Sequence, residues 1–218
     1  MSLYYQDDYV TLYHGDCLTD HREWLEADVL VTDPPYGIGW KIGNHPKRGS
    51  VAHAGIQNDE DTKARDAVIE SFMPKPILAF GAWSQQVANA KQTLVWRKPA
   101  DAGVIGSTTG FRRDTELIFM LGTWPKKSAA WSSVLTTDAG MGAYLSGHPH
   151  SKPVGLMERL IEKCPPGTIA DPFAGSGATL VAAKALGRKV TGVELEERYC
   201  EIIAKRCAQD VLDIFGAA

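Results

Sequence analysis

The sequence predicts an α/β domain built on a mainly parallel β-sheet. Short runs of apolar, often β-branched residues alternate with stretches of helical period, which is the order expected when helices connect parallel strands. Some of these runs are apolar throughout rather than alternating, as is typical of strands covered on both faces. The chain has 218 residues, 44% of them hydrophobic, and this size and composition suit a single domain over residues 1–218.

Seven segments are predicted as strands. The run at 27–32 (ADVLVT) is apolar with β-branched residues, and it ends abruptly at Asp33-Pro34-Pro35 because proline cannot continue a central strand. The other six segments lie at 10–14, 76–80, 92–96, 116–121, 168–170 and 189–193.

Helices are predicted between these strands. Val154, Met157, Leu160 and Ile161 mark one face of a helix that stops at residues 164–167 (CPPG). Further helices are expected at 59–71, 84–90, 177–186 and 196–211, with a helical turn at 20–26. Residues 37–58 and 122–147 show no clear period, and loops of that length in compact domains are usually functional or disordered.

The charge is unevenly distributed, although its sum is only −3. Basic residues concentrate in residues 37–58 and 97–128, where an anionic polymer such as DNA could lie. The alternative interpretation is two solvated surface loops. The residues expected to contact DNA are Lys41, Lys47, Arg48, Arg112 and Arg113.

Several features indicate a cytoplasmic protein without a metal site or membrane segment. The four cysteines form no CxxC pair and have no metal-ligand spacing, so we expect reduced, buried thiols. No apolar run approaches the roughly 20 residues that a membrane helix needs. Residues 1–8 are polar and acidic, unlike a signal peptide.

Residues 169–177 (IADPFAGSG) predict a strand that runs through a glycine-rich turn into a helix. Glu194 ends the next strand, about twenty residues later, where an acid can hydrogen-bond ribose hydroxyls. The turn is not GxGxxG, and no basic residue is placed for a pyrophosphate. A nucleoside without phosphates therefore fits better than a dinucleotide.

The segment 171–177 (DPFAGSG) resembles motif I of the amino-methyltransferases, which binds S-adenosylmethionine. The resemblance implies that this cofactor contacts Asp171, Phe173, Gly175, Ser176 and Gly177, with Glu194 at its ribose.

Two further segments resemble cofactor-binding parts of that family. Residues 148–153 (HPHSKP) resemble motif X, which lines the methionine end of the cofactor. Lys152 matches that motif, whereas His150 and Ser151 replace the usual Thr-Gln. Residues 14–17 (HGDC) resemble the strand end that contacts the cofactor adenine, with Asp16 accepting from its amino group and the Cys17 backbone nearby.

Asp33-Pro34-Pro35-Tyr36 matches motif IV, the catalytic loop of the same family. A plain Asx-Pro turn is the structural alternative. A base amino group is a poor nucleophile, because its lone pair is delocalised into the ring. The Asp33 carboxylate and the Pro34 carbonyl can accept its two N–H bonds and aim the lone pair at a methyl group, while the prolines keep both acceptors in place. Tyr36 can stack on the base, which must be flipped out of the duplex.

The catalytic motif precedes the cofactor motif, and this order resembles the beta class of DNA amino-methyltransferases. The resemblance implies a Rossmann-like, doubly wound, mainly parallel seven-stranded sheet of the methyltransferase type, circularly permuted, with the strands before Asp33 and Asp171 as neighbours. Beta-class relatives are often dimers, so a homodimer is one expected assembly. The loops 37–58 and 122–147 are then the segments available for DNA contact and recognition.

The favoured function is methylation of N6 of adenine in double-stranded DNA, since Asp at position 33 is more typical of adenine enzymes. Methylation of N4 of cytosine is the alternative. Methylation of RNA or of a protein glutamine, and a non-catalytic nucleotide-binding regulator, are the remaining readings.

Overall fold

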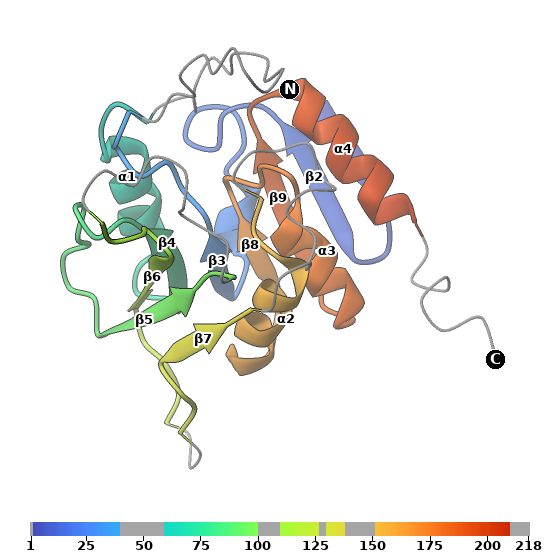
Figure 1. Cartoon of the computed structure of the whole chain (residues 1–218). Coiled ribbons are helices and arrows are strands. Elements are labelled where there is room, and N and C mark those ends of the chain that lie inside the picture. The colour runs from blue at the N-terminus through green and yellow to red at the C-terminus, as the bar shows by residue number, and fades with distance from the viewer. Residues whose placement is uncertain (1, 40–58, 100–109, 127–129, 138–150, 210–218) are drawn as a thin grey trace.

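The computed structural model describes residues 2–39, 59–99, 110–126, 130–137 and 151–209. These residues form one nine-stranded sheet in the order β1-β2-β9-β8-β3-β4-β6-β5-β7, with helices against both faces (Figure 1). The strands are β1 (Ser2–Gln6), β2 (Val10–His14), β3 (Val29–Thr32), β4 (Ile77–Gly81), β5 (Gln92–Arg97), β6 (Thr115–Leu121), β7 (Val134–Thr136), β8 (Ile169–Asp171) and β9 (Val190–Glu194). The helices are α1 (Lys63–Phe72), α2 (Val154–Lys163), α3 (Ala178–Ala185) and α4 (Glu197–Ala208), with a 3₁₀-helix η1 at Glu23–Glu26.

The centre of the sheet is parallel and its edges are mixed. Strands β2, β9, β8, β3 and β4 pair in parallel, whereas β6 runs antiparallel to both of its neighbours and β1 runs antiparallel to β2. All four residues of β3 and all five of β4 are buried. The continuous apolar runs in the sequence reflect this cover on both faces.

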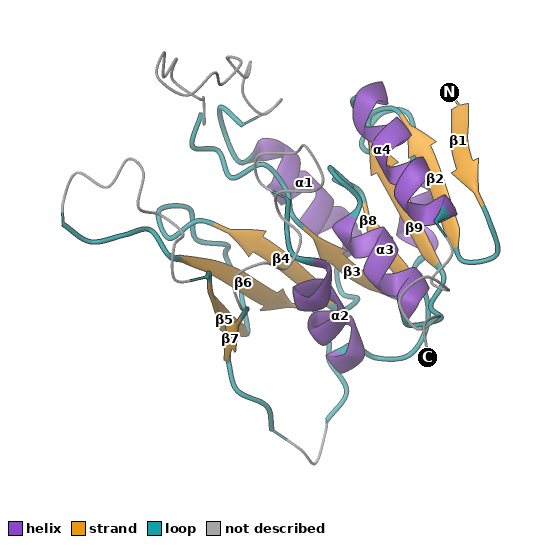
Figure 2. Ribbon diagram, turned by 45° about the vertical axis from the view of Figure 1, so that its right-hand side comes forward, coloured by secondary structure: helices purple, strands orange, loops and turns teal. Residues whose placement is uncertain are grey.

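Pleating divides the core into two layers. Val29 and Val31 of β3 pack in the cluster that contains α2, α3 and α4, which lie across the same face of the sheet (Figure 2). Leu30, between them, packs in the other cluster, with Trp24 of η1 and with α1. Successive strand residues point to opposite faces, so three residues of one strand serve both layers.

All seven predicted strands are present, but the number seven is wrong for the described part of the chain, where the sheet has nine. The two additions, β1 and β7, are the edge strands. Both are largely exposed, so neither shows the buried apolar pattern by which the inner strands are recognised.

The helix predicted at 84–90 is wrong, because these residues form turns. Asn89 adopts a φ of 62°, in the left-handed region that interrupts a right-handed helix. The predicted turn at 20–26 is confirmed in part as η1. The helix predicted from residue 59 begins only at Lys63. None of the helices among the described residues is long and apolar enough to cross a membrane.

Strands β3 and β8 lie side by side in the middle of the sheet. Val29 pairs with Ile169 and Leu30 with Ala170, in parallel register. Asp33 and Asp171 therefore lie at the carboxyl ends of neighbouring strands, as the resemblance implied, although most of the chain separates them. Ligands of open α/β sheets bind beyond this edge.

Candidate active site

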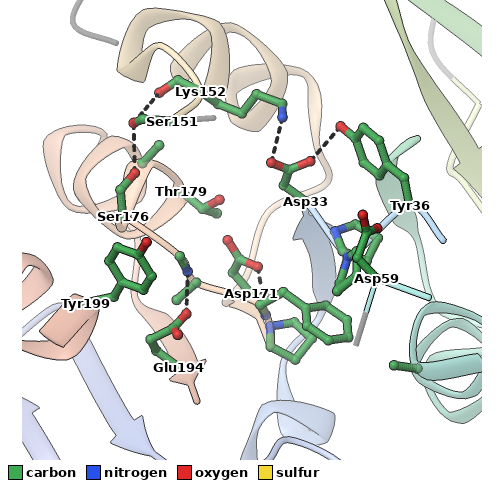
Figure 3. Close-up of a pocket in the computed structure, with 18 of the residues that line it drawn as sticks. Asp33, Tyr36, Asp59, Ser151, Lys152, Asp171, Ser176, Thr179, Glu194 and Tyr199 are labelled. Atoms are coloured by element: carbon green, nitrogen blue, oxygen red, sulfur yellow. Dashed lines mark hydrogen bonds and ion pairs between the residues drawn. The ribbon is translucent and has the colours of Figure 1, made fainter. Parts of the chain in front are cut away.

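A cavity of about 780 Å³ lies at the carboxyl ends of the central strands, and most of the predicted site residues line it. Figure 3 shows the Asp33 side and the Glu194 side of this cavity facing each other. The predicted residues on its wall are Asp16, Cys17, Asp33, Pro34, Pro35, Tyr36, Arg112, Arg113, Lys152, Asp171, Phe173, Gly175, Ser176 and Glu194.

Glu194 is held at the end of β9 by backbone N–H groups. Its Oε2 accepts from the Gly175 N–H at 2.7 Å and its Oε1 from the Glu196 N–H at 2.8 Å. Gly175 has a φ of 54°, a conformation in which glycine is favoured. Burial raises the pKa of Glu194 to about 7, and the two backbone hydrogen bonds only partly oppose this shift. The turn thus presents a nearly buried carboxyl to the cavity.

Asp171 connects the two halves of the site. The Thr32 hydroxyl, at the end of β3, donates to Asp171 Oδ1 at 2.7 Å, and the Phe173 N–H donates to the same oxygen at 3.2 Å. Burial raises the pKa of Asp171 to about 6, against hydrogen bonds from Thr179 and Thr32 that lower it. This contact fixes the end of β3 against the glycine-rich turn after β8.

Ser151 and Ser176 join the segment before α2 to the glycine-rich turn. Their hydroxyl oxygens are 2.7 Å apart and both side chains are buried. Ser151 is one of the positions at which the sequence departs from the motif it resembles. The sequence contains no sign of this contact, because the two serines belong to segments that only the fold brings together.

Asp33 lies directly after β3 and has a partner on each carboxylate oxygen. Lys152 Nζ contacts Oδ2 at 2.6 Å, and the Tyr36 hydroxyl donates to Oδ1 at 2.8 Å (Figure 3). Burial raises the pKa of Asp33, the Lys152 charge opposes this, and the Glu116 charge adds to it. Burial alone would lower the pKa of Lys152, but the carboxylates of Asp33 and Glu116 raise it overall, so the lysine stays charged.

Glu116 is a site residue that sequence reasoning missed. Its Oε1 pairs with Lys98 at 2.6 Å, and its Oε2 lies 3.2 Å from Lys152 Nζ and 3.2 Å from the Tyr36 hydroxyl. Burial acts to raise its pKa, but the two lysines outweigh burial and lower it to about 2. A lone acid in the otherwise apolar segment 116–121 (ELIFML) was the available signal.

Comparisons with known proteins match this chain to a family of methylases. The sequence profile of a family described as DNA methylase, acting at N6 or N4, matches residues 27–205. The type II methyltransferase M.ScaI of Streptomyces caespitosus is 38% identical over 262 residues, covering 97% of this chain and 86% of that enzyme. The chain belongs to the N6/N4 DNA methylase family.

Solved structures share the fold of this methylase. The M1.HpyAVI complex with S-adenosylmethionine superposes with a TM-score of 0.67 at 20% identity, covering 91% of this chain and 99% of that one. The cytosine-N4-specific PvuII DNA methyltransferase superposes with a TM-score of 0.65 at 17% identity, covering 95% of this chain and 89% of that one.

Three predicted cofactor residues, Asp16, Cys17 and Gly177, also shape or pack the fold itself. Gly177 does not line the cavity; it precedes α3 with a φ of 82°, and a Cβ there would lie 2.8 Å from Ile203. Asp16 Oδ1 accepts from the Leu18 N–H at 2.7 Å, which shapes the turn after β2. Cys17 is buried, and burial raises the pKa of its thiol to about 12, so this thiol is unreactive.

Asp59 is a second residue that sequence reasoning missed, and it holds the backbone beyond Tyr36. Its Oδ1 accepts from the Gly37 N–H at 2.8 Å, and its carbonyl accepts from the Gly39 N–H at 2.6 Å. Asp59 is buried and lines the cavity. The segment before α1 thus fixes the backbone that follows residues 33–36.

Arg112 and Arg113 stand on the cavity wall together with exposed apolar side chains. Trp83 is 58% exposed and Ile38 is 46% exposed. The indole N–H of Trp83 donates to the Thr115 hydroxyl at 3.1 Å, which holds the ring in place. The other predicted DNA contacts, Lys41, Lys47 and Arg48, lie outside the described residues, as do most of 37–58 and much of 122–147.

Proposed function

We propose that this protein transfers a methyl group from S-adenosylmethionine to N6 of an adenine in double-stranded DNA. The observation that carries the proposal is the position of Asp33-Pro34-Pro35-Tyr36 on the same cavity as Glu194 and the turn after Asp171. A nucleoside site and a pair of fixed hydrogen-bond acceptors then face one another across a single space.

The residues present fit S-adenosylmethionine. In this proposal Glu194 accepts from ribose hydroxyls and Asp16 from the adenine amino group, and both residues line the cavity. The positive sulfonium suits a cavity into which Asp171 and Asp33 project carboxylates. When bound, the cofactor supplies an electrophilic methyl group.

The catalytic loop acts on the nucleophile. The Asp33 carboxylate and the Pro34 carbonyl accept the two amino N–H bonds, so the nitrogen lone pair is directed at the methyl group. Methylation would leave the cofactor sulfur as a neutral thioether and would release one amino proton to the solvent. Tyr36 stacks on the target base, which has to leave the duplex to reach this depth. The Tyr36 hydroxyl bond to Asp33 sets the orientation of the ring.

DNA binds in this proposal where basic side chains and exposed apolar side chains border the cavity. Arg112 and Arg113 contact phosphates, and Lys41, Lys47 and Arg48 extend this basic surface. The loops 37–58 and 122–147 of this single domain select the site. The alignment with M.ScaI is longer than the 218 residues of this chain, so that relative has residues where this chain has none. A short or loosely defined recognition site is the consequence for this smaller protein.

The chain order, with Asp33 before Asp171, makes this a circularly permuted enzyme of beta-class arrangement. A cytoplasmic homodimer is the proposed assembly, with the second subunit extending the grip on DNA. Light scattering that shows a strict monomer with and without DNA would exclude the dimer.

Methylation of N4 of cytosine is the second candidate, since that amino group presents the same two N–H bonds to the same acceptors. The PvuII enzyme, whose fold this chain shares, is cytosine-N4-specific. Asp33, rather than a serine, favours the adenine reading.

The deciding experiment incubates the protein with duplex DNA and labelled S-adenosylmethionine, digests the DNA to nucleosides and identifies the labelled one. N6-methyl-2′-deoxyadenosine is expected, and N4-methyl-2′-deoxycytidine would establish the second candidate. Label that enters only RNA or protein glutamine would overturn the DNA substrate. Cofactor binding without transfer to any of these acceptors would indicate a non-catalytic regulator.

A further inference from the structure

Four side chains of alternating charge form a chain beside Tyr36. Lys98 contacts Glu116 at 2.6 Å, Glu116 contacts Lys152 at 3.2 Å, and Lys152 contacts Asp33 at 2.6 Å. They come from four separate segments: the residue after β5, strand β6, the residues before α2, and the residue after β3. Two lysines face two carboxylates, so the set is neutral as a whole.

Glu116 occupies the middle of this chain. Its Oε2 faces both Lys152 Nζ and the Tyr36 hydroxyl. The same hydroxyl is also placed to donate to Asp33 Oδ1, and because it carries one proton, the two carboxylates compete for it. Since the pKa of Glu116 is about 2, Glu116 is an anion throughout the neutral range.

This competition affects the acceptor that methyl transfer needs. Inside a cavity, a lysine held by one carboxylate alone would bind it tightly, because attraction between charges is stronger there than in water. An Asp33 carboxylate neutralised in this way would be a weaker acceptor for a base amino group. Glu116 draws part of the Lys152 charge and part of the Tyr36 hydrogen bond away from Asp33.

We propose that Glu116 is a positioning residue for methyl transfer, which divides Lys152 and the Tyr36 hydroxyl between two carboxylates and so keeps Asp33 available to the amino group of the target base. The inference rests on the proposed function, in which Asp33 and Tyr36 touch the base. Glu116 acts only through Lys152 and Tyr36.

The charges around Asp33 predict how substitutions should change the pH dependence of methyl transfer. The titratable groups that face Glu116 and Asp33 from the neighbouring segments are Lys98, Lys152, Tyr36 and Asp171. The negative charge of Glu116 raises the pKa of Asp33, so Glu116→Gln lowers that pKa. Lys98→Met removes a positive charge from the far side of Glu116 and shifts the pKa of Asp33 upward. A general loosening of the site would not produce opposite shifts.

The test measures single-turnover methylation of duplex DNA across pH, for the wild type, Glu116→Gln, Lys98→Met and Glu116→Asp. For Glu116→Gln we expect a methyl-transfer rate at least about 10-fold lower than wild type. The acid limb of its pH–rate profile, where the rate falls as Asp33 becomes protonated, should lie about one pH unit lower. One unit is the smaller end of the pKa shift that one neighbouring charge causes. The acid limb of Lys98→Met should move to higher pH. Glu116→Asp, which keeps the charge, should restore the wild-type limb even if its rate stays low.

Binding and melting measurements separate positioning from structure. Cofactor affinity of Glu116→Gln, measured by calorimetry, should stay within about threefold of wild type, because Glu116 reaches the cofactor side through Lys152, which keeps its ion pair with Asp33. Glu162→Gln is the matched control, since that exposed glutamate lies on α2 and pairs with the neighbouring Lys163. It should change neither rate nor limb.

Three results would overturn the inference while the proposed function stands: an unmoved acid limb in Glu116→Gln, limbs of both variants that move in the same direction, or a rate loss matched by equal losses of cofactor affinity and melting temperature. A wild-type protein that methylates no DNA would instead overturn the proposed function itself, and this inference with it.

Discussion

The two sides of the cavity hold their carboxylates in different ways. On the Glu194 side, uncharged donors bind the acids: backbone N–H groups hold Glu194, and the Thr32 hydroxyl with a backbone N–H holds Asp171. On the Asp33 side, lysines bind them: Lys152 contacts Asp33 and Glu116, and Lys98 contacts Glu116. Where the donors are neutral, burial dominates and the pKa values of Asp171 and Glu194 are raised. Where the partners are lysines, Glu116 stays ionised.

This difference indicates that the two sides of the cavity have different functions. The Glu194 side is a shaped surface of fixed hydrogen-bonding groups, which suits recognition of an uncharged ribose and adenine. The Asp33 side is a balanced set of full charges, in which a small shift in one pair alters the strength of the others. The two sides should therefore respond differently to substitution and to pH.

The largest expected effect is on the Asp33 side. Asp33→Ala should reduce methyl transfer by roughly 10³-fold or more, because it removes a fixed acceptor for the amino group. Cofactor affinity should persist, as measured by calorimetry. The exposed Asp8 is a control, and Asp8→Ala should leave both quantities unchanged. Retained transfer in Asp33→Ala would refute the catalytic role of the loop.

The reciprocal change tests the other side. Glu194→Gln should weaken cofactor binding by roughly 10- to 100-fold, the range expected for hydrogen bonds to a charged acceptor. The transfer rate at saturating cofactor should stay within a few-fold of wild type. If the saturated rate collapses while affinity persists, the separation of binding from chemistry is wrong.

The two sides of the cavity should differ in the pH dependence of stability, to which Glu194 contributes and Glu116 does not. Its pKa is raised from 4.5 to about 7, so the folded protein binds more protons than the unfolded chain between these values. Stability contributed by this group is therefore present below pH 4.5 and lost as pH rises through about 7. Glu194→Gln should flatten that decline in melting temperature, recorded without cofactor. Glu116→Gln should not flatten it, because the pKa of Glu116 lies near 2.

The smallest expected effect concerns the bond between the segment before α2 and the glycine-rich turn. Ser151→Ala removes a buried hydroxyl that bonds to Ser176 and should weaken cofactor binding by about 2- to 10-fold, as expected for one neutral hydrogen bond. The exposed Ser132 provides the control variant Ser132→Ala. A loss as large as that of Glu194→Gln would mean that Ser151 contacts the cofactor directly.

Local sequence determined much of this protein. The apolar run into Asp33-Pro34-Pro35 and the glycine-rich turn after Asp171 each prescribe their own backbone, because proline and glycine act on neighbouring dihedral angles. Together with the strand–helix alternation, they were sufficient to predict the inner strands of the sheet. The pairing of its two middle strands and most of the cavity wall followed from the resemblance of these motifs to the amino-methyltransferases.

Tertiary structure alone decided how these motifs are connected. Lys152 reaches Asp33 across 119 positions of sequence, and Glu116 joins them only because β6 pairs with β4 in one register. The edge strands β1 and β7 are defined by their partners rather than by burial. The sequence thus determined which backbone turns and acids exist, and the fold decided which charges face each other, because side-chain contacts depend on register and packing between distant segments.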